Sequence, residues 1–114
     1  MTAEDAAATA LVHAMRRFRR DGLAVGTAGN ASVRLPDGRL AITPTGVRST
    51  RLESDHVSIV DLEGRTIRGL APSSELALHR TLYQRRPDVA AVVHTHSLSA
   101  TALAVAEREL PHRR

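Results

Sequence analysis

Two short segments, 31–35 and 39–43, are separated by Pro36-Asp37-Gly38. Strand-length segments that flank a proline, an aspartate and a glycine are typical of a β-hairpin. The chain is therefore expected to contain a sheet. Two further segments, 56–62 and 90–96, are predicted strands, and 65–68 is predicted to be a short partner strand.

Three helices are predicted between and around these strands. The first follows a capping-box-like Thr2 and Asp5, carries apolar residues at helical spacing and ends at Asp21-Gly22. The second is predicted over about 74–86, ended by a proline, and the third after Ser97 or Ser99. Strands mixed with three helices in 114 residues predict a single α/β layered domain over 1–114.

The composition excludes several chemistries. The chain has no cysteine, which excludes disulfides, thiolate metal sites and cysteine nucleophiles. All 16 of its Lys and Arg residues are arginine, and the net charge is +4. Without lysine, neither a Schiff-base mechanism nor a P-loop is available.

The densest basic cluster lies at 16–20, where four arginines close the first predicted helix. Cations favour a helix C-terminus, and the only aromatic residues are Phe18 and Tyr83, so we expect a solvated helix end and no nucleic-acid partner. The N-terminus is acidic, unlike a secretory signal, and the longest run of small apolar residues, 100–106, is too short to span a bilayer. We expect a soluble cytoplasmic protein without a membrane partner.

His94 and His96 are the strongest local signal for chemistry. Residues two apart on a strand point to the same face, so both imidazoles can converge on one zinc or similar divalent ion. The alternative is a pair of hydrogen-bonded structural histidines, because zinc usually takes at least three protein ligands.

Ser73, Ser74 and Glu75 lie at the start of the second predicted helix. Unpaired N–H groups there favour an anion such as phosphate, and the alternative is an ordinary helix cap. His79, one turn later, could ligate, orient the carboxylate or pack, and packing or support is favoured. Two loops, 26–30 and 45–46, also offer glycine N–H groups with Asn or Thr donors, although loops commonly use these residues for turns.

Five motifs in this order and spacing resemble the class II aldolase/adducin family: GTAGNASVR, ITPTG, PSSE, HRTLYQRRPD and AVVHTH. The resemblance extends over about 11–111. It implies a three-layer α/β/α domain with a central, mostly antiparallel sheet. It also implies zinc-dependent cleavage of a phosphorylated ketose, similar to fuculose 1-phosphate, to dihydroxyacetone phosphate and an aldehyde.

The resemblance also implies roles for particular residues. Glu75 would be the catalytic acid/base and would also bind the metal in the empty enzyme, and His94 and His96 would bind zinc. Six residues would hold the substrate phosphate: Gly29, Asn30, Thr45, Gly46, Ser73 and Ser74.

Members of this family continue beyond the position of Arg114, and their later part carries the third zinc histidine. The chain is therefore expected to be the N-terminal portion of the domain, C-terminally truncated, with little or no activity by itself. The complete protein is expected to be a homo-oligomer, by resemblance a tetramer. Alternatives are 4-epimerisation or dehydration of a sugar phosphate on the same scaffold, or a non-catalytic, adducin-like remnant.

Overall fold

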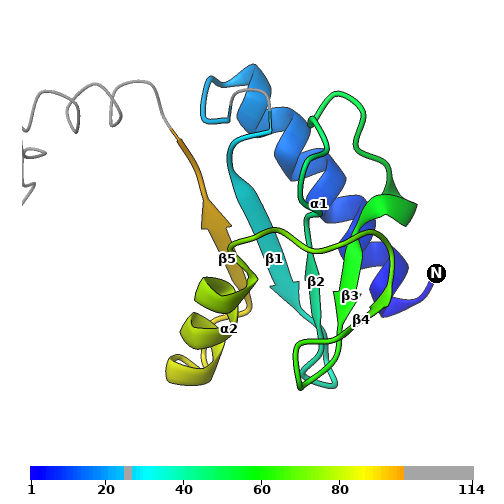
Figure 1. Ribbon diagram of the computed structural model, residues 1–114, viewed down its shortest axis with the longest axis vertical. Coiled ribbons are helices and arrows are strands. Elements are labelled where there is room, and N and C mark those ends of the chain that lie inside the picture. The colour runs from blue at the N-terminus through cyan, green and yellow to red at the C-terminus, as the bar shows by residue number, and fades with distance from the viewer. Residues whose placement is uncertain (25–26, 97–114) are drawn as a thin grey trace, which may run out of the picture.

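The computed structural model describes residues 1–24 and 27–96 of the 114-residue chain. Within these ranges five short strands form one sheet in the order β4-β3-β2-β1-β5, and every neighbouring pair is antiparallel (Figure 1). The strands are β1 (Asn30–Arg34), β2 (Leu40–Ile42), β3 (Ser58–Val60), β4 (Thr66–Arg68) and β5 (Ala91–His94). The third predicted helix lies outside the described residues.

Tight turns fix the register of the two hairpins. Between β1 and β2, the Leu35 N–H donates to the Arg39 carbonyl at 2.8 Å, and Ser32 pairs with Ile42. Between β3 and β4, the Asp61 N–H donates to the Arg65 carbonyl at 2.9 Å. The hairpin at Pro36-Asp37-Gly38 and the short partner strand at 65–68 are thus confirmed.

Helix α1 (Ala3–Arg20) covers one face of the sheet. Its N-terminus carries the capping box: the Asp5 N–H donates to Thr2 Oγ1 at 3.1 Å, and the Thr2 N–H donates to the Asp5 carboxylate at 3.4 Å. The buried face of α1 packs on side chains of the sheet and the following loops in one core. Helix α1 contributes five buried apolar residues to this core: Ala7, Ala8, Leu11, Val12 and Met15.

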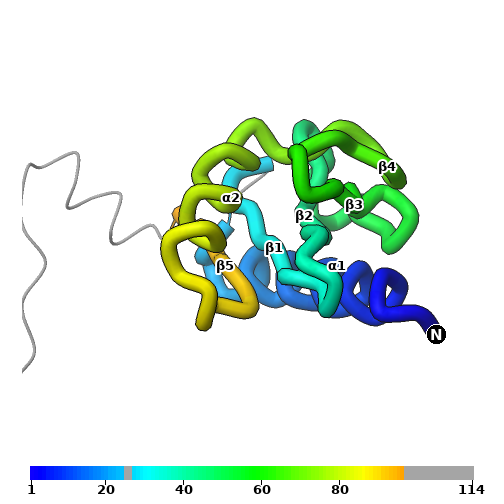
Figure 2. Tube along the Cα trace, turned by 90° about the horizontal axis from the view of Figure 1, so that it is seen from below, coloured from blue at the N-terminus to red at the C-terminus, as the bar shows by residue number. Residues whose placement is uncertain are grey.

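Helix α2 (Leu76–Arg85) covers the opposite face, over β1 and β5, and the segment between β4 and α2 crosses that face (Figure 2). Seen edge-on, α1, the sheet and α2 form three layers. The predicted α/β/α architecture with an antiparallel sheet is therefore confirmed.

Two predicted strands differ from the structure. A 3-10 turn, η1 (Ser54–His56), replaces the start of the strand predicted at 56–62, and only Ser58–Val60 pair as β3. The strand predicted at 90–96 ends at His94 and is an edge strand with half-exposed side chains rather than a buried one, because among the described residues only β1 pairs with it. No helix in the described ranges has the length and apolarity needed to cross a membrane.

Candidate active site

All nine residues assigned to the site from the sequence line one hollow of about 330 Å³ at the ends of β1 and β5. The structure thus brings together loops that are far apart in the chain, as expected from their shared anion donors. The wall is completed by three residues that were not assigned: Thr27, Ala28 and Pro44.

The loops at 43–45 and 71–73 meet because their backbones pair. The Thr45 N–H donates to the Ala71 carbonyl and the Ser73 N–H donates to the Thr43 carbonyl, both at 3.0 Å, around an isolated bridge between two prolines. This pairing carries Thr45 and Ser73 to the same side of the hollow.

Gly29 and Gly46 each have a backbone conformation that favours glycine. Gly29 has φ +87°, and a Cβ there would lie 3.2 Å from both the His94 carbonyl oxygen and the Ala24 side chain. Gly46 has φ +72° and open space around it, so its requirement is conformational. A glycine at 46 also leaves the backbone of the hollow accessible to a ligand.

Glu75 lies at the N-cap of α2, one position before the helix, rather than in its first turn as predicted. A turn at 73–76 causes the difference, because the Leu76 N–H donates to the Ser73 carbonyl at 3.0 Å. The Glu75 N–H donates to Ser73 Oγ at 3.1 Å. The Glu75 carboxylate is half-buried and caps no N–H group, so it remains available to a substrate.

His94 ends β5, and His96 follows two residues later in the same hollow. Their ring centroids are 4.9 Å apart. The backbone N–H of His96 donates to the Leu23 carbonyl at 2.7 Å, which holds this segment against the end of α1. The two imidazoles are therefore neighbours, as their spacing of two predicts.

The donors around the hollow fit a divalent transition metal in kind, because they comprise two neighbouring imidazoles and one carboxylate. Across residues 1–24 and 27–96, however, no three His, Asp or Glu side chains gather closely enough to hold an ion. The assignment of Glu75, His94 and His96 as metal ligands therefore stays a prediction. A metal held here would require Glu75 or the histidines to move, or a further ligand.

A buried chain of hydrogen bonds lies behind the hollow. The side-chain oxygen of Asn30, Oδ1, accepts from His79 Nε2 at 2.5 Å, and Nδ1 of His79 lies 2.6 Å from Ser32 Oγ. Ser32 Oγ in turn lies 2.8 Å from the Tyr83 hydroxyl. Since a carbonyl oxygen can only accept, a neutral His79 donates from Nε2 and accepts at Nδ1 from Ser32, which accepts from Tyr83.

His79 is fully buried, and burial lowers its pKa below 6.5, with the neighbouring His94 lowering it further and Glu75 opposing the shift. Its neutral form suits the chain of hydrogen bonds just described. The structure therefore gives His79 the supporting role favoured among its three alternatives. Its effect reaches the hollow through Asn30, whose amide nitrogen lies 3.5 Å from His94 Nδ1.

Ser32 and Tyr83 were not identified from the sequence. Their positions carry a signal nonetheless: Ser32 is two residues after Asn30 on β1, and Tyr83 is four residues after His79 on α2. Spacings of two on a strand and four on a helix place each pair on one face. Both pairs then meet between the sheet and α2.

Residues 9–113 match the family described as "Class II Aldolase and Adducin N-terminal domain". The L-fuculose phosphate aldolase of Escherichia coli strain K12 is 47% identical over 92 residues, which cover 81% of this chain and 42% of that protein. The methylthioribulose-1-phosphate dehydratase of Gluconacetobacter diazotrophicus is 46% identical over 99 residues, 86% of this chain and 48% of that protein.

Among solved structures, YgbL from Escherichia coli, described as a candidate aldolase, epimerase or decarboxylase, superposes with a TM-score of 0.85 at 37% identity. The match covers 90% of this chain and 50% of YgbL. The chain thus spans about half the length of the curated relatives that it matches.

Proposed function

Since the chain belongs to the class II aldolase and adducin family, we propose that it carries the phosphate-binding and acid/base part of a zinc-dependent aldehyde-lyase. The reaction is cleavage of a phosphorylated ketose, similar to fuculose 1-phosphate, to dihydroxyacetone phosphate and an aldehyde. The complete protein would act in the cytoplasm as a homo-oligomer, a tetramer by family resemblance.

The observation that supports this proposal most directly is the convergence of three donor-rich loops on one hollow. Thr45, Ser73 and Ser74 supply hydroxyl groups, and the glycines at 29 and 46 keep their backbone open. Such donors suit a phosphate group, which accepts several hydrogen bonds at once. The substrate phosphate would be held here, with its carbon chain directed toward Glu75 and the histidines.

Glu75 is the residue that would move a proton. Cleavage of the carbon–carbon bond requires loss of a hydroxyl proton from the aldehyde-forming fragment and delivery of a proton to the carbon of the phosphate-bearing fragment. A half-buried carboxylate at the rim of the hollow can accept the first and supply the second.

His94 and His96, with Glu75, would hold the metal ion. The bound ion supplies Lewis-acid stabilisation of the negative charge that develops on the substrate. A Schiff base cannot supply it, because the chain contains no lysine. Asn30 would keep the His94 ring oriented through its contact at Nδ1.

A second candidate is dehydration, decarboxylation or epimerisation of a related sugar phosphate by the same hollow. The similarity to a dehydratase, at 46% identity, and to the structure of YgbL supports this second candidate. These reactions share phosphate binding and a proton-transferring carboxylate, and they differ in the bond that breaks. A non-catalytic, adducin-like domain is the third candidate, and the presence of Glu75, His94 and His96 around one hollow argues against it.

The test is an assay of the protein, with any sequence that its gene encodes beyond Arg114, in the presence of Zn²⁺. We expect dihydroxyacetone phosphate to form from L-fuculose 1-phosphate, and Glu75→Gln to lower the rate by about 10²-fold or more, the range of one acid/base group. Glu63→Gln, an equal change at an exposed carboxylate outside the hollow, should leave the rate unchanged.

Different outcomes separate the candidates. Loss of water from a methylthioribulose phosphate without carbon–carbon cleavage would replace the lyase by the dehydratase. Binding of the sugar phosphate without turnover of any of these substrates would support the non-catalytic domain. Equal rates for the Glu75 and Glu63 variants would remove Glu75 from the mechanism.

A further inference from the structure

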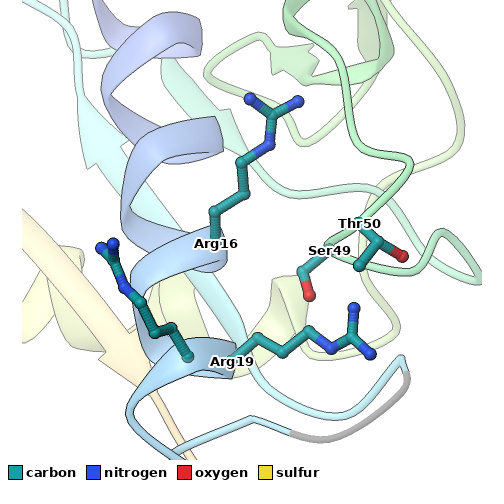
Figure 3. A pocket seen from close by; sticks show the side chains of 5 residues that line it. Arg16, Arg19, Ser49 and Thr50 are labelled. Atoms are coloured by element: carbon teal, nitrogen blue, oxygen red, sulfur yellow. The ribbon is translucent and has the colours of Figure 1, made fainter.

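A second cavity lies between the C-terminal half of α1 and the loop at 48–52 (Figure 3). Its volume is about 430 Å³, and it shares no lining residue with the hollow that contains Glu75. We call it the arginine pocket, because it is lined by Arg16, Arg19, Arg20, Ser49 and Thr50.

The arginine pocket concentrates positive charge without a carboxylate in its lining. In the described part of the chain, no ion pair involves Arg16, Arg19 or Arg20. Arg17, by contrast, lies on the same helix outside the pocket and pairs with Asp21 at 3.7 Å. Arg16 donates to the Leu52 carbonyl at 3.0 Å, which fixes the orientation of its guanidinium.

Ser49 provides the second observation. The residue is only 5% exposed, and its hydroxyl is the one buried side-chain polar atom of residues 1–24 and 27–96 without a hydrogen-bond partner. A buried hydroxyl left unpaired is costly, so such a group calls for a specific explanation. Figure 3 shows the Ser49 side chain extending from the loop toward α1, into the pocket.

Solvation of a basic helix end explains arginines in the last turn of α1, but it does not explain a buried, unpaired hydroxyl among them. An oxyanion explains both. Its oxygens would accept from the guanidinium groups and from Ser49 and Thr50, and guanidinium–phosphate contacts are strong because they are charge-assisted and bidentate.

We propose that the arginine pocket is a second phosphate-binding site, which takes the phosphate group of a small phosphorylated metabolite. A volume of about 430 Å³ exceeds what a lone phosphate needs and leaves room for an organic part. The site is additional to the proposed lyase function and does not depend on it.

The experiment is a titration of the 114-residue protein with inorganic phosphate, and separately with glycerol phosphate, at constant ionic strength. Backbone amide NMR signals of Ser49 and Thr50 report on the arginine pocket, and those of Thr45 and Ser73 report on the hollow. We expect saturable shifts at Ser49 and Thr50, with the monoester binding at least as tightly as inorganic phosphate.

Arg19→Gln should weaken binding at Ser49 and Thr50 about tenfold, the loss expected for one charge-assisted contact. Arg17→Gln removes the same charge two residues earlier on α1, outside the pocket. It should alter the affinity for phosphate by less than about twofold, since exposed charges act weakly at a distance. Shifts at Thr45 and Ser73 should be the same in both variants, so the two phosphate sites are tested separately.

Ser49→Ala separates binding from folding. Removal of an unpaired buried hydroxyl should leave the melting temperature equal or higher while it weakens phosphate binding several-fold. Linear, non-saturating shifts, equal weakening by Arg17→Gln and Arg19→Gln, or binding of inorganic phosphate but not of the monoester would overturn the proposal. So would preferential binding of a DNA duplex with a steep salt dependence.

Discussion

Among single residues, Asn30 connects the buried interior with the candidate active site. Its side-chain oxygen Oδ1 accepts from His79, while its side-chain nitrogen Nδ2 lies beside His94 and keeps one hydrogen for another acceptor. Asn30 itself is only 7% exposed and pairs with His94 across the β1–β5 ladder. The family resemblance assigns Asn30 to substrate phosphate, and the structure adds a contact of 3.5 Å between its amide nitrogen and His94 Nδ1.

His79→Phe should therefore lower the free energy of unfolding by about 2–4 kcal/mol, because the Asn30 side-chain oxygen and the Ser32 hydroxyl would each lose a buried partner. It should also change the pH dependence. The folded state lowers the pKa of His79 below 6.5, so the unfolded chain binds this proton more readily, and stability falls as the pH falls below about 6.5.

Urea unfolding at pH 7.5 and pH 5 measures both effects. The loss of stability toward pH 5 should be smaller in His79→Phe than in the original protein, and His13→Gln, at an exposed position of α1, should leave that loss unchanged. The same acid dependence in the His79 variant would show that this buried imidazole is not its source.

The residues of the site were predictable where residue type and sequence order combined in motifs. The nine assigned residues lie in four of the five ordered motifs, and all nine line one hollow. The supporting residues Ser32 and Tyr83 were not predictable in the same way. Serine and tyrosine are ordinary on a strand and a helix, and only the packing of α2 on β1 reveals their hydrogen bond.

At the scale of elements, the N-terminal turn of α1 is attached to the edges of two hairpins by charge. Glu4 lies 2.6 Å from Arg39, just before β2, and 3.2 Å from Arg68 on β4. Asp5 also pairs with Arg68, at 3.0 Å. One helix end is thus linked to two parts of the sheet that are far away in sequence.

Glu4→Gln should lower the melting temperature at pH 7 and low salt, because both guanidinium partners lose a carboxylate. Hydrogen bonds from Arg39, and then from Arg68, hold the pKa of Glu4 below 4.5. The stabilisation is therefore present above pH 4.5 and is lost as the pH falls through the lowered value.

Thermal unfolding of both proteins at pH 7 and pH 3 measures this difference, which should shrink at pH 3 and in high salt. Asp21→Asn is the matched control, since Asp21 makes only a local pair with Arg17 at the exposed end of α1. An equal loss in both variants would show that the link between helix and sheet adds nothing beyond a surface ion pair.

Elements with strong local signals were predicted most closely. The first helix was placed correctly because its capping box and its apolar spacing are both local. The strands at 56–62 and 90–96 were predicted too long or too buried, since strand ends and edge positions depend on which partners pair across the sheet. Apolar residues such as Val92 and Val93 do not by themselves distinguish an edge strand from a central one.

At the scale of the whole molecule, the sheet has a buried centre and two exposed edges within residues 1–24 and 27–96. All residues of β2 and β3 are buried, whereas β4 is exposed throughout and β5 alternates between exposed and half-buried. The candidate metal ligand His94 lies on one of these edges. β5, the exposed strand that carries His94, is therefore the strand of the site whose local stability a bound ligand can raise most.

Amide hydrogen exchange should reflect this arrangement. Amides of β2 and β3 should exchange at least ~10-fold more slowly than those of β4 and β5, because edge strands with few buried contacts open by local fluctuations. If His94 and His96 bind Zn²⁺, the ion should slow exchange in β5 while leaving β4 unchanged, since a ligand stabilises only the state that binds it. His94→Ala should abolish the zinc effect in β5. Equal slowing of both edges by Zn²⁺, or slowing that persists in His94→Ala, would place the ion elsewhere and would remove the support of β5 for the metal site.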